Sequence, residues 1–541
     1  MIKNSYIYRA ISIIFLIVFI PVLFLIYFFG NNMEYHLACK NTTLYSNGII
    51  LIFVMAFILI AFLGFYLFKN IKMDKKLSMI VTGVLGLLFV GFYFVNLEIC
   101  KCIWLEQQWD IGCVVGGALK LSLGEPLSEQ YNGSYFSLYP NNVPITYILY
   151  QIYELANSME NFTYWNEFAW IISICILISV AGFLTCMTVK KVTNNLFVTF
   201  ITLLLYVIFF TLSPWKTAPY TDMFGILAPV CCLCLYVYSC YAKNKVLKYI
   251  LWFFSLFIGI LSALIKITIL IVPIAIILLD FLRDILHIKK QWKGFLLKVF
   301  FAFLLFMVYL GYKEYIYDKV GYVYDENAAV TYHHYLLMGL NEENNGSYNS
   351  DMVAFHGQFM TPEERIPAQN ERIVNDLTEK GFCGYIKFVY TKLVMTFNDG
   401  AFGWGREGQF TYNLYPSFGD EKLTLLLRDF FWPGYLYSGQ FNTISQFVWL
   451  LIISLVPGIC ITKKNFISNQ DKHVVAVILL AIVGVIFYQI LFESRARYLL
   501  CFVPVFIVAA GIGIGQYYEV IREFIVKIRE KVAHKKLERN I

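Results

Sequence analysis

The residue best placed to do chemistry is a single acid, Asp110, in a polar stretch between long apolar runs. Trp109 precedes it, and the sequence that follows, VVGGALKLSLGEPL, is typical of a helix that lies along a membrane surface. A carboxylate beside an aromatic ring at the mouth of a helix bundle is partly desolvated, which raises its basicity toward that of a general base. We therefore predict that Asp110 is the catalytic residue. A solvated surface acid is the simpler alternative.

Four cations are predicted to bind an anion, and a phosphate suits them best. Lys266 lies between apolar runs in LSALIKITILIVP, where an ammonium is costly unless it reaches a partner or, by snorkelling, water. Arg495 and Arg497 follow Glu493 in a tight turn, and a guanidinium binds phosphate through two parallel hydrogen bonds. Pairing of these arginines with Glu493 is the alternative. Arg406, in the glycine-rich run NDGAFGWGREG, is the fourth cation.

Aromatic, amide and acidic residues near these groups would suit a sugar, which presents apolar ring faces and hydroxyls that donate and accept hydrogen bonds. The structural alternatives are a helix cap at the Tyr-Pro-Asn-Asn turn, a surface ion pair of Asp222 with Lys216, and a loop folded over the bundle at Trp404. The predicted substrate-binding residues are Trp109, Tyr139, Asn141, Asn142, Tyr220, Asp222, Trp404, Glu407 and Glu493.

No pattern in the sequence indicates a metal or a cofactor. His333 and His334 are adjacent, so on a helix their side chains would point about 100° apart, which is poor geometry for chelation. Many of the 13 cysteines lie inside apolar runs, where they are expected to pack as small apolar side chains. We therefore predict no cofactor and no metal site, although a divalent metal is compatible with the sequence.

The chain that carries these residues is predicted to be an all-α polytopic membrane protein. It has 541 residues, of which 59% are hydrophobic and 15% charged, whereas soluble domains average about 45–50% apolar and about 25% charged residues. Apolar runs of the length that crosses a bilayer, roughly 20 residues, recur along it. About twelve spans are expected, near 9–30, 48–68, 78–98, 164–188, 195–213, 219–240, 249–265, 267–283, 296–313, 443–461, 473–492 and 498–517.

The distribution of Lys and Arg predicts the orientation of these spans. Basic residues cluster in alternate short loops and in the tail from Arg522 to Arg539. Because such loops favour the cytoplasmic side, we expect a cell-membrane protein with both termini cytoplasmic and the Asp110 side extracytoplasmic. This topology accounts for the net charge of +7 without a nucleic-acid partner. It also requires Val143–Ala156, which is apolar but short, to be an interfacial or re-entrant half-helix.

The spans and loops predict six segments along the chain. They are N-terminal transmembrane helices at 1–98, an extracytoplasmic catalytic loop with interfacial helices at 99–163, a central transmembrane bundle at 164–313, a large extracytoplasmic segment or small domain at 314–442, C-terminal transmembrane helices at 443–520, and a basic cytoplasmic tail at 521–541.

Several of these features resemble the GT-C-type glycosyltransferases, which include the protein O-mannosyltransferases, the lipid A aminoarabinose transferase and glycosyltransferase family 39. The matching residues are the acid of an outer loop, Asp110, with the interfacial helix after it, the turn at Tyr139 and Pro140, and the Glu493–Tyr498 motif. Three runs, YFSLYPNN, HHYLLMGLN and NDGAFGWGREG, look similar to a bacterial cell-envelope branch. Two additional spans precede the helix that leads to Asp110, whereas the family's loop usually follows its first span.

The resemblance implies transfer of a sugar from a polyprenyl-phosphate carrier to an envelope glycan, lipid or protein on the outer face of the membrane. Asp110 would then remove the proton of the acceptor hydroxyl. Arg495 and Arg497, with Lys266 or Arg406, would bind the carrier phosphate. The expected partners are this donor, the acceptor and the lipid bilayer. The alternatives are a transporter or flippase of lipid-linked sugars, and a polysaccharide polymerase or ligase.

Overall fold

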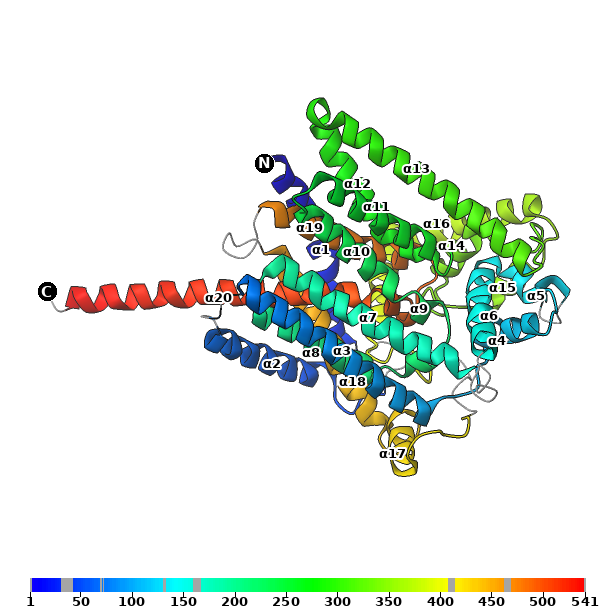
Figure 1. The fold of residues 1–541 in the computed structure, drawn as a ribbon, viewed down its shortest axis with the longest axis horizontal. Coiled ribbons are helices and arrows are strands. Elements are labelled where there is room, and N and C mark those ends of the chain that lie inside the picture. The colour runs from blue at the N-terminus through cyan, green and yellow to red at the C-terminus, as the bar shows by residue number, and fades with distance from the viewer. Residues whose placement is uncertain are drawn as a thin grey trace.

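The computed structural model confirms an all-helical polytopic architecture (Figure 1). The structure describes residues 2–30, 42–68, 71, 73–129, 133–158, 167–406, 414–461 and 469–539. No β-strand occurs in these ranges, and a single antiparallel bridge joins Leu105 to Leu414.

Ten helical segments in the described part of the chain are long and apolar enough to cross a membrane. Two of them begin where a polar side chain caps the first turn. Asp74 accepts a hydrogen bond from the Leu77 amide before α3, and Asn244 accepts one from the Val246 amide before α11. The helices that form them are α1 (Ile2–Phe29), α2 (Asn47–Phe68), α3 (Lys75–Ile103), α7 (Phe168–Thr193), α10 (Leu227–Tyr241), α11 (Lys245–Ser262), α13 (Ile288–Lys319), α18 (Ser438–Leu455), α19 (Asn469–Leu491) and α20 (Val503–Arg539).

The expected number of twelve spans is therefore not confirmed, because the remaining two helices are short. Helix α8 (Leu196–Leu212) is apolar but has 17 residues. Helix α12 (Ile271–Leu286) has 16 residues and carries Asp280, Arg283 and Asp284 near its end. At about 1.5 Å per residue, such helices reach roughly 24–26 Å, less than the hydrocarbon core of about 30 Å.

The helices between the spans gather at one end of the bundle, at the right of Figure 1, which we call the loop end. The segment expected to be an interfacial half-helix forms α6 (Val143–Asn157), which packs against α4 (Trp109–Ser122). The other helices at this end are α5 (Gly133–Leu138), α14 (Tyr332–Leu340), α15 (Ser350–His356), α16 (Pro362–Phe397) and α17 (Glu421–Phe431).

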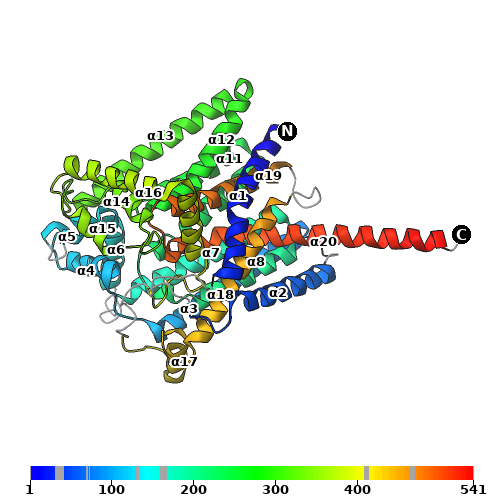
Figure 2. The same ribbon diagram turned by 180° about the vertical axis from the view of Figure 1, so that it is seen from behind.

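The segment 314–442 is packed into the bundle through the last turns of α16. Phe388, Leu393 and Phe397 of this helix are buried, and α16 contacts α1, α14 and α19. Figure 2 shows α1 lying across the face of the bundle that α18 and α19 form. The phenol of Tyr27 in α1 donates a hydrogen bond to the Leu450 carbonyl of α18. Consequently the loop end is held by the same helices that build the core.

A buried charge network ties helices together at the other end of the bundle. Asp280 is 2% exposed, and its two oxygens accept hydrogen bonds from five side chains. The donors, with distances to Asp280, are Tyr236 Oη at 2.8 Å, Trp252 Nε1 at 2.9 Å, Arg283 Nη2 at 2.8 Å, Lys298 Nζ at 2.9 Å and His473 Nε2 at 3.0 Å. They come from α10 to α13 and α19, so one carboxylate joins five helices.

We expect Asp280→Ala to destabilise the fold strongly, by roughly 3–5 kcal/mol, because it leaves Lys298 and Arg283 less compensated in a low-dielectric site. The measurement is the unfolding midpoint of the purified chain in detergent. Glu98→Gln is the control, since the Glu98–Lys101 pair is half exposed and should contribute about 1 kcal/mol or less. Equal midpoints for the two variants would contradict the prediction.

Candidate functional site

Three charged side chains meet at the loop end of the bundle, each from a short helical turn. Asp222 lies in α9 (Thr221–Phe224), Lys266 precedes η5 (Ile267–Leu270), and Arg497 lies in η7 (Ala496–Phe502). The Lys266 ammonium donates to Asp222 Oδ1, and Arg497 Nε lies 3.5 Å from Asp222 Oδ2. The three side chains are only 12%, 7% and 3% exposed for Lys266, Arg497 and Asp222. We call this group the ion triad.

Aromatic rings frame the two cations of the triad. The Arg497 guanidinium lies over the rings of Trp215 and Tyr220, at 5.4 and 5.5 Å from their centroids. The Lys266 ammonium lies 4.6 Å from the centroid of the Tyr498 ring. Cation–π contacts of this kind favour a cation that has lost part of its water. The rings therefore help to hold two positive charges around one carboxylate.

Tyr220 connects the triad to the predicted catalytic loop. The buried Asn142 amide donates to the hydroxyls of Tyr135 and Tyr220, at 2.6 and 3.3 Å. Burial raises the pKa of Tyr220; the Asp110 carboxylate adds to this rise, and Arg497 opposes it. Tyr220 therefore lies within electrostatic reach of both Asp110 and Arg497, which come from distant parts of the sequence.

The side chain of Asn142 does not act as a helix cap, which was the structural alternative for this turn. Asn142 occupies the N-cap position of α6, but its side chain makes no capping hydrogen bond. Its amide oxygen instead accepts from Asn141 Nδ2, at 3.2 Å. Nearby, burial and then the Asp110 charge raise the pKa of Tyr139 to about 12. Tyr139 and Tyr220 are therefore both within electrostatic reach of Asp110, and Tyr220 is hydrogen-bonded to Asn142.

Asp110 itself is exposed, so the partial desolvation expected from its neighbour is wrong. Trp109 is 50% exposed and has a left-handed backbone (φ 58°), which is uncommon for a bulky side chain. The two residues form the first turn of α4, where the partial positive charge of a helix N-terminus favours an anionic carboxylate. The acid therefore sits in a position open to an incoming molecule.

The two arginines of the Glu493–Tyr498 turn differ in their surroundings. Arg495 Nε donates to Glu493 Oε1 at 2.7 Å, and its guanidinium lies 5.4 Å from the centroid of the Tyr348 ring. Arg497 instead reaches Asp222. The intramolecular pair considered as the alternative therefore applies to Arg495, and the ion triad includes Arg497.

Arg406 and Trp404 are placed apart from the triad. The Arg406 guanidinium pairs with Asp399, whose carboxylate also accepts from the amides of Ala401 and Gly403, at 3.0 and 2.6 Å. Trp404 is 2% exposed, and its indole N–H donates to the Phe431 carbonyl. These contacts brace the loop from Asn398 to Arg406. The loop meets the site at Trp215, whose ring packs against Trp404 and whose indole N–H donates to the Ala401 carbonyl at 3.2 Å. Glu407 lies outside the described residues.

Lys216 does not pair with Asp222, contrary to the alternative drawn from their proximity in sequence. Its buried ammonium donates to Asn96 Oδ1 at 2.8 Å and to the carbonyls of Phe210 and Thr211, at 3.2 and 2.9 Å. A lysine just after the end of a helix is a known signal for capping the last carbonyls. Neither this capping role of Lys216 nor the position of Trp215 beneath Arg497 was predicted from the sequence.

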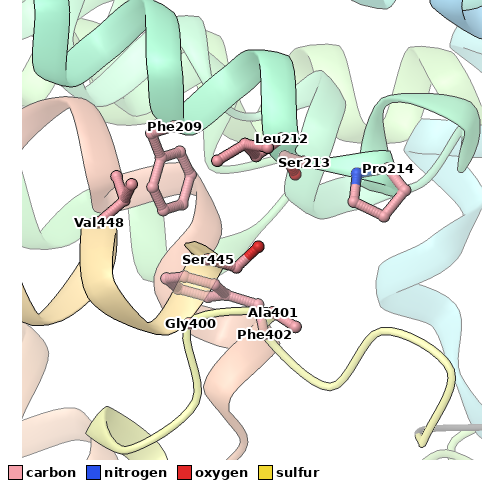
Figure 3. Close-up of a pocket in the computed structure, with 9 residues that line it drawn as sticks. All are labelled: Phe209, Leu212, Ser213, Pro214, Gly400, Ala401, Phe402, Ser445 and Val448. Carbon is pink, nitrogen blue, oxygen red and sulfur yellow. The ribbon is translucent and has the colours of Figure 1, made fainter. Parts of the chain in front are cut away.

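A small pocket lies between α8, α18 and the loop after Asn398 (Figure 3). It has room for about one water molecule. Its lining is mainly apolar and comes from α8, α18 and the loop after Asn398, namely Phe209, Leu212, Ser213, Pro214, Gly400, Ala401, Phe402, Ser445 and Val448. Within the ranges that the structure describes, no three His, Cys, Asp or Glu side chains form a metal-binding group.

Two buried histidines next to the site should make the fold sensitive to acid. Burial lowers the pKa of His334 to about 4, with His356 and Arg365 adding to the shift and Glu493 opposing it. The unfolded state, with a pKa near 6.5, binds the proton first as pH falls, so stability is complete above about pH 6.5 and is lost toward pH 4. We expect a loss of about 2 kcal/mol by pH 5, which His334→Gln removes.

The measurement is the thermal midpoint in detergent at pH 7 and pH 5. His287→Gln, at the other end of the bundle, is the control. An unchanged difference between the two pH values in His334→Gln would rule out this source of acid sensitivity.

Comparison with known proteins shows the family to which the chain belongs. A family model described as conserved hypothetical integral membrane protein matches residues 4–517. No curated protein and no solved structure matches the chain. The match covers the spans, the loop end and the ion triad. The chain therefore belongs to the family of conserved hypothetical integral membrane proteins.

Proposed function

We propose that the chain is a membrane glycosyltransferase that moves a sugar from a polyprenyl-phosphate carrier to an acceptor. The observation that supports this proposal most is the ion triad at the loop end, with Tyr220 beside Arg497 and with Asp110 near enough to raise the pKa of Tyr220. These groups provide a cationic place for a phosphate and an open carboxylate for a hydroxyl. The helices and turns that carry these residues are far apart in sequence, yet all lie at the loop end.

In this proposal Lys266 and Arg497 bind the phosphate of the donor. With Asp222, these two cations carry a net charge of +1 if all three are ionised, which a phosphodiester with one negative charge neutralises. Positive groups that are already oriented stabilise the negative charge that develops on the leaving phosphate. Arg495, beside Glu493, lies close enough in the chain to join them.

Asp110 acts as the general base. The acceptor hydroxyl oxygen attacks the anomeric carbon of the sugar, the bond from that carbon to the phosphate oxygen breaks, and the hydroxyl proton passes to Asp110. The carrier leaves as a polyprenyl phosphate. Proton transfer to a positioned side chain contributes about 10²–10⁴-fold to such a reaction. Trp109, which precedes the acid, would contact the sugar together with Tyr139, Asn141 and Asn142.

The bilayer explains why this chemistry would occur at the end of a helix bundle. The prenyl tail of the donor remains among lipids, so its phosphate stays near the membrane surface. The basic loops identified above favour an extracytoplasmic site with both termini in the cytoplasm. The acceptor would then be an envelope glycan, lipid or protein.

The direct test reconstitutes the purified chain in liposomes with a panel of polyprenyl-phosphate sugars and envelope acceptors. We expect a glycosylated acceptor and free polyprenyl phosphate in equal amounts. Movement of the lipid-linked sugar across the bilayer without any glycosylated acceptor would instead favour a transporter.

A further inference from the structure

The large segment between α13 and α18 makes a dense set of contacts with the turn that carries Arg495 and Arg497. Lys392, in α16, is buried, and its ammonium donates to three carbonyls. The acceptors are Gly339 O at 2.8 Å, Ile490 O at 3.1 Å and Phe492 O at 2.6 Å. The first ends α14 and the other two end α19, so one lysine joins three helices directly before Glu493.

The backbone of the next two residues is tied to the same segment. The Glu493 amide donates to the Tyr335 carbonyl at 3.0 Å, and the Ser494 amide donates to the Gly346 carbonyl at 2.9 Å. The hydroxyls of Ser494 and Thr396 also form a hydrogen bond. Three consecutive residues, from Phe492 to Ser494, therefore take their positions from α14, α16 and the loop between them.

Two glycines make this close approach possible. A Cβ on Gly339 would lie 2.6 Å from the Phe492 carbonyl carbon and 2.7 Å from the Leu491 oxygen. Gly346 has a left-handed backbone (φ 77°), and a Cβ there would lie 2.6 Å from Lys392 Cε. These contacts give a structural role to Gly339 in the run HHYLLMGLN and to Gly346 in the Asn/Gly-rich turn after it, which the catalytic proposal does not use.

We infer that this segment is a clamp that positions the anion-binding turn, with Lys392 as its central positioning residue. The inference rests on the proposed function, because it assigns the turn to phosphate binding. Arg497 is three residues beyond Ser494, and a short chain fixed at Ser494 limits where the guanidinium can lie. Cations held in place before the ligand arrives bind it without the cost of ordering them.

The test compares Lys392→Met, Thr396→Val and Gly339→Ala with matched controls. Lys387→Met changes an exposed lysine of the same helix, Thr396→Ser keeps the hydroxyl, and Gly384→Ala adds a Cβ that meets only ordinary contacts. Each full-length variant is purified in detergent and titrated with polyprenyl phosphate, and binding is measured by native mass spectrometry. Hydrogen exchange of the amides in 490–498 reports on the turn itself.

We expect the three clamp variants to bind polyprenyl phosphate about tenfold more weakly and to exchange the Glu493 and Ser494 amides faster, because small displacements of binding groups have large effects. The controls should match the unchanged chain. Thr396→Val is the mildest of the three variants and is expected to remain folded, because it removes one hydroxyl and leaves Lys392 in place.

Two results would overturn the clamp. One is faster amide exchange with unchanged affinity, which would mean that the turn's position does not matter for binding. The other is slow exchange of the Glu493 and Ser494 amides in all three clamp variants, which would mean that the turn keeps its position without these contacts. Arg497→Gln separates this inference from the proposed function. If Arg497→Gln binds normally, the phosphate assignment itself is wrong, whereas loss of binding in Arg497→Gln with normal binding in the clamp variants rejects only the clamp.

Discussion

Asp110→Asn is expected to abolish sugar transfer while carrier binding remains. The amide keeps the size of the side chain but cannot accept the proton of the acceptor hydroxyl, so the rate should fall by about 10²–10⁴-fold. The phosphate would still meet Lys266 and Arg497, which pair with Asp222. Loss of rate with retained binding is the signature of a group that acts in the transition state.

The measurement combines transfer rates in liposomes with titration of polyprenyl phosphate in detergent. Glu106→Gln is a suitable control, because Glu106 is an exposed acid in the same loop. Full transfer by Asp110→Asn would remove Asp110 from the mechanism, and Asp222 would then be the acid to test.

Arg497→Gln is expected to weaken binding of polyprenyl phosphate by about 10- to 100-fold. A charge-assisted hydrogen bond contributes about 1.5–3 kcal/mol, and each 1.4 kcal/mol changes affinity tenfold. Arg497→Lys should recover only part of the loss, since an ammonium lacks the planar arrangement of donors that matches a phosphate and stacks on Trp215.

The buried carboxylate complicates this experiment, because removing Arg497 leaves Asp222 with Lys266 as its remaining partner in the triad. The double variant Asp222→Asn with Arg497→Gln removes that imbalance. We expect the double variant to regain thermal stability but not phosphate binding. Arg522→Gln, 47% exposed at the other end of the bundle, is the control for a general change of charge. Normal binding by Arg497→Gln in the same titration would contradict the assignment.

The helical class could be predicted from sequence because it depends on local properties. Apolar runs and polar caps predict where helices begin, as at Asn195 and Asn244, which accept hydrogen bonds from the first amides of α8 and α11. The number of spans was less predictable. The 267–283 run is apolar overall, but Asp280 and Arg283 belong to a charge network whose partners come from other helices, and a window of hydropathy does not register such partners.

For the site as well, the residue types could be recognised in the sequence, whereas their partners come from distant parts of the chain. The types of residue at Asp110, Lys266 and Arg497 indicated an acid and an anion site in advance. Their partners were not evident. Asp222 seemed closest to Lys216, six residues away, yet it pairs with Lys266, 44 residues away, while Lys216 caps α8. The exposure of Asp110 was misjudged because whether a neighbouring ring covers a carboxylate depends on packing.

The sequence by itself determined that this chain is a membrane-embedded helical protein with a few costly charges, because burial of apolar surface and the cost of a charge in lipid act on each residue where it stands. Only the tertiary structure decided that Asp222, Lys266 and Arg497 form one triad beside Tyr220, and that Lys392 fixes the turn next to it. Helical periodicity reports which face of a helix is apolar, but not which other helix that face meets.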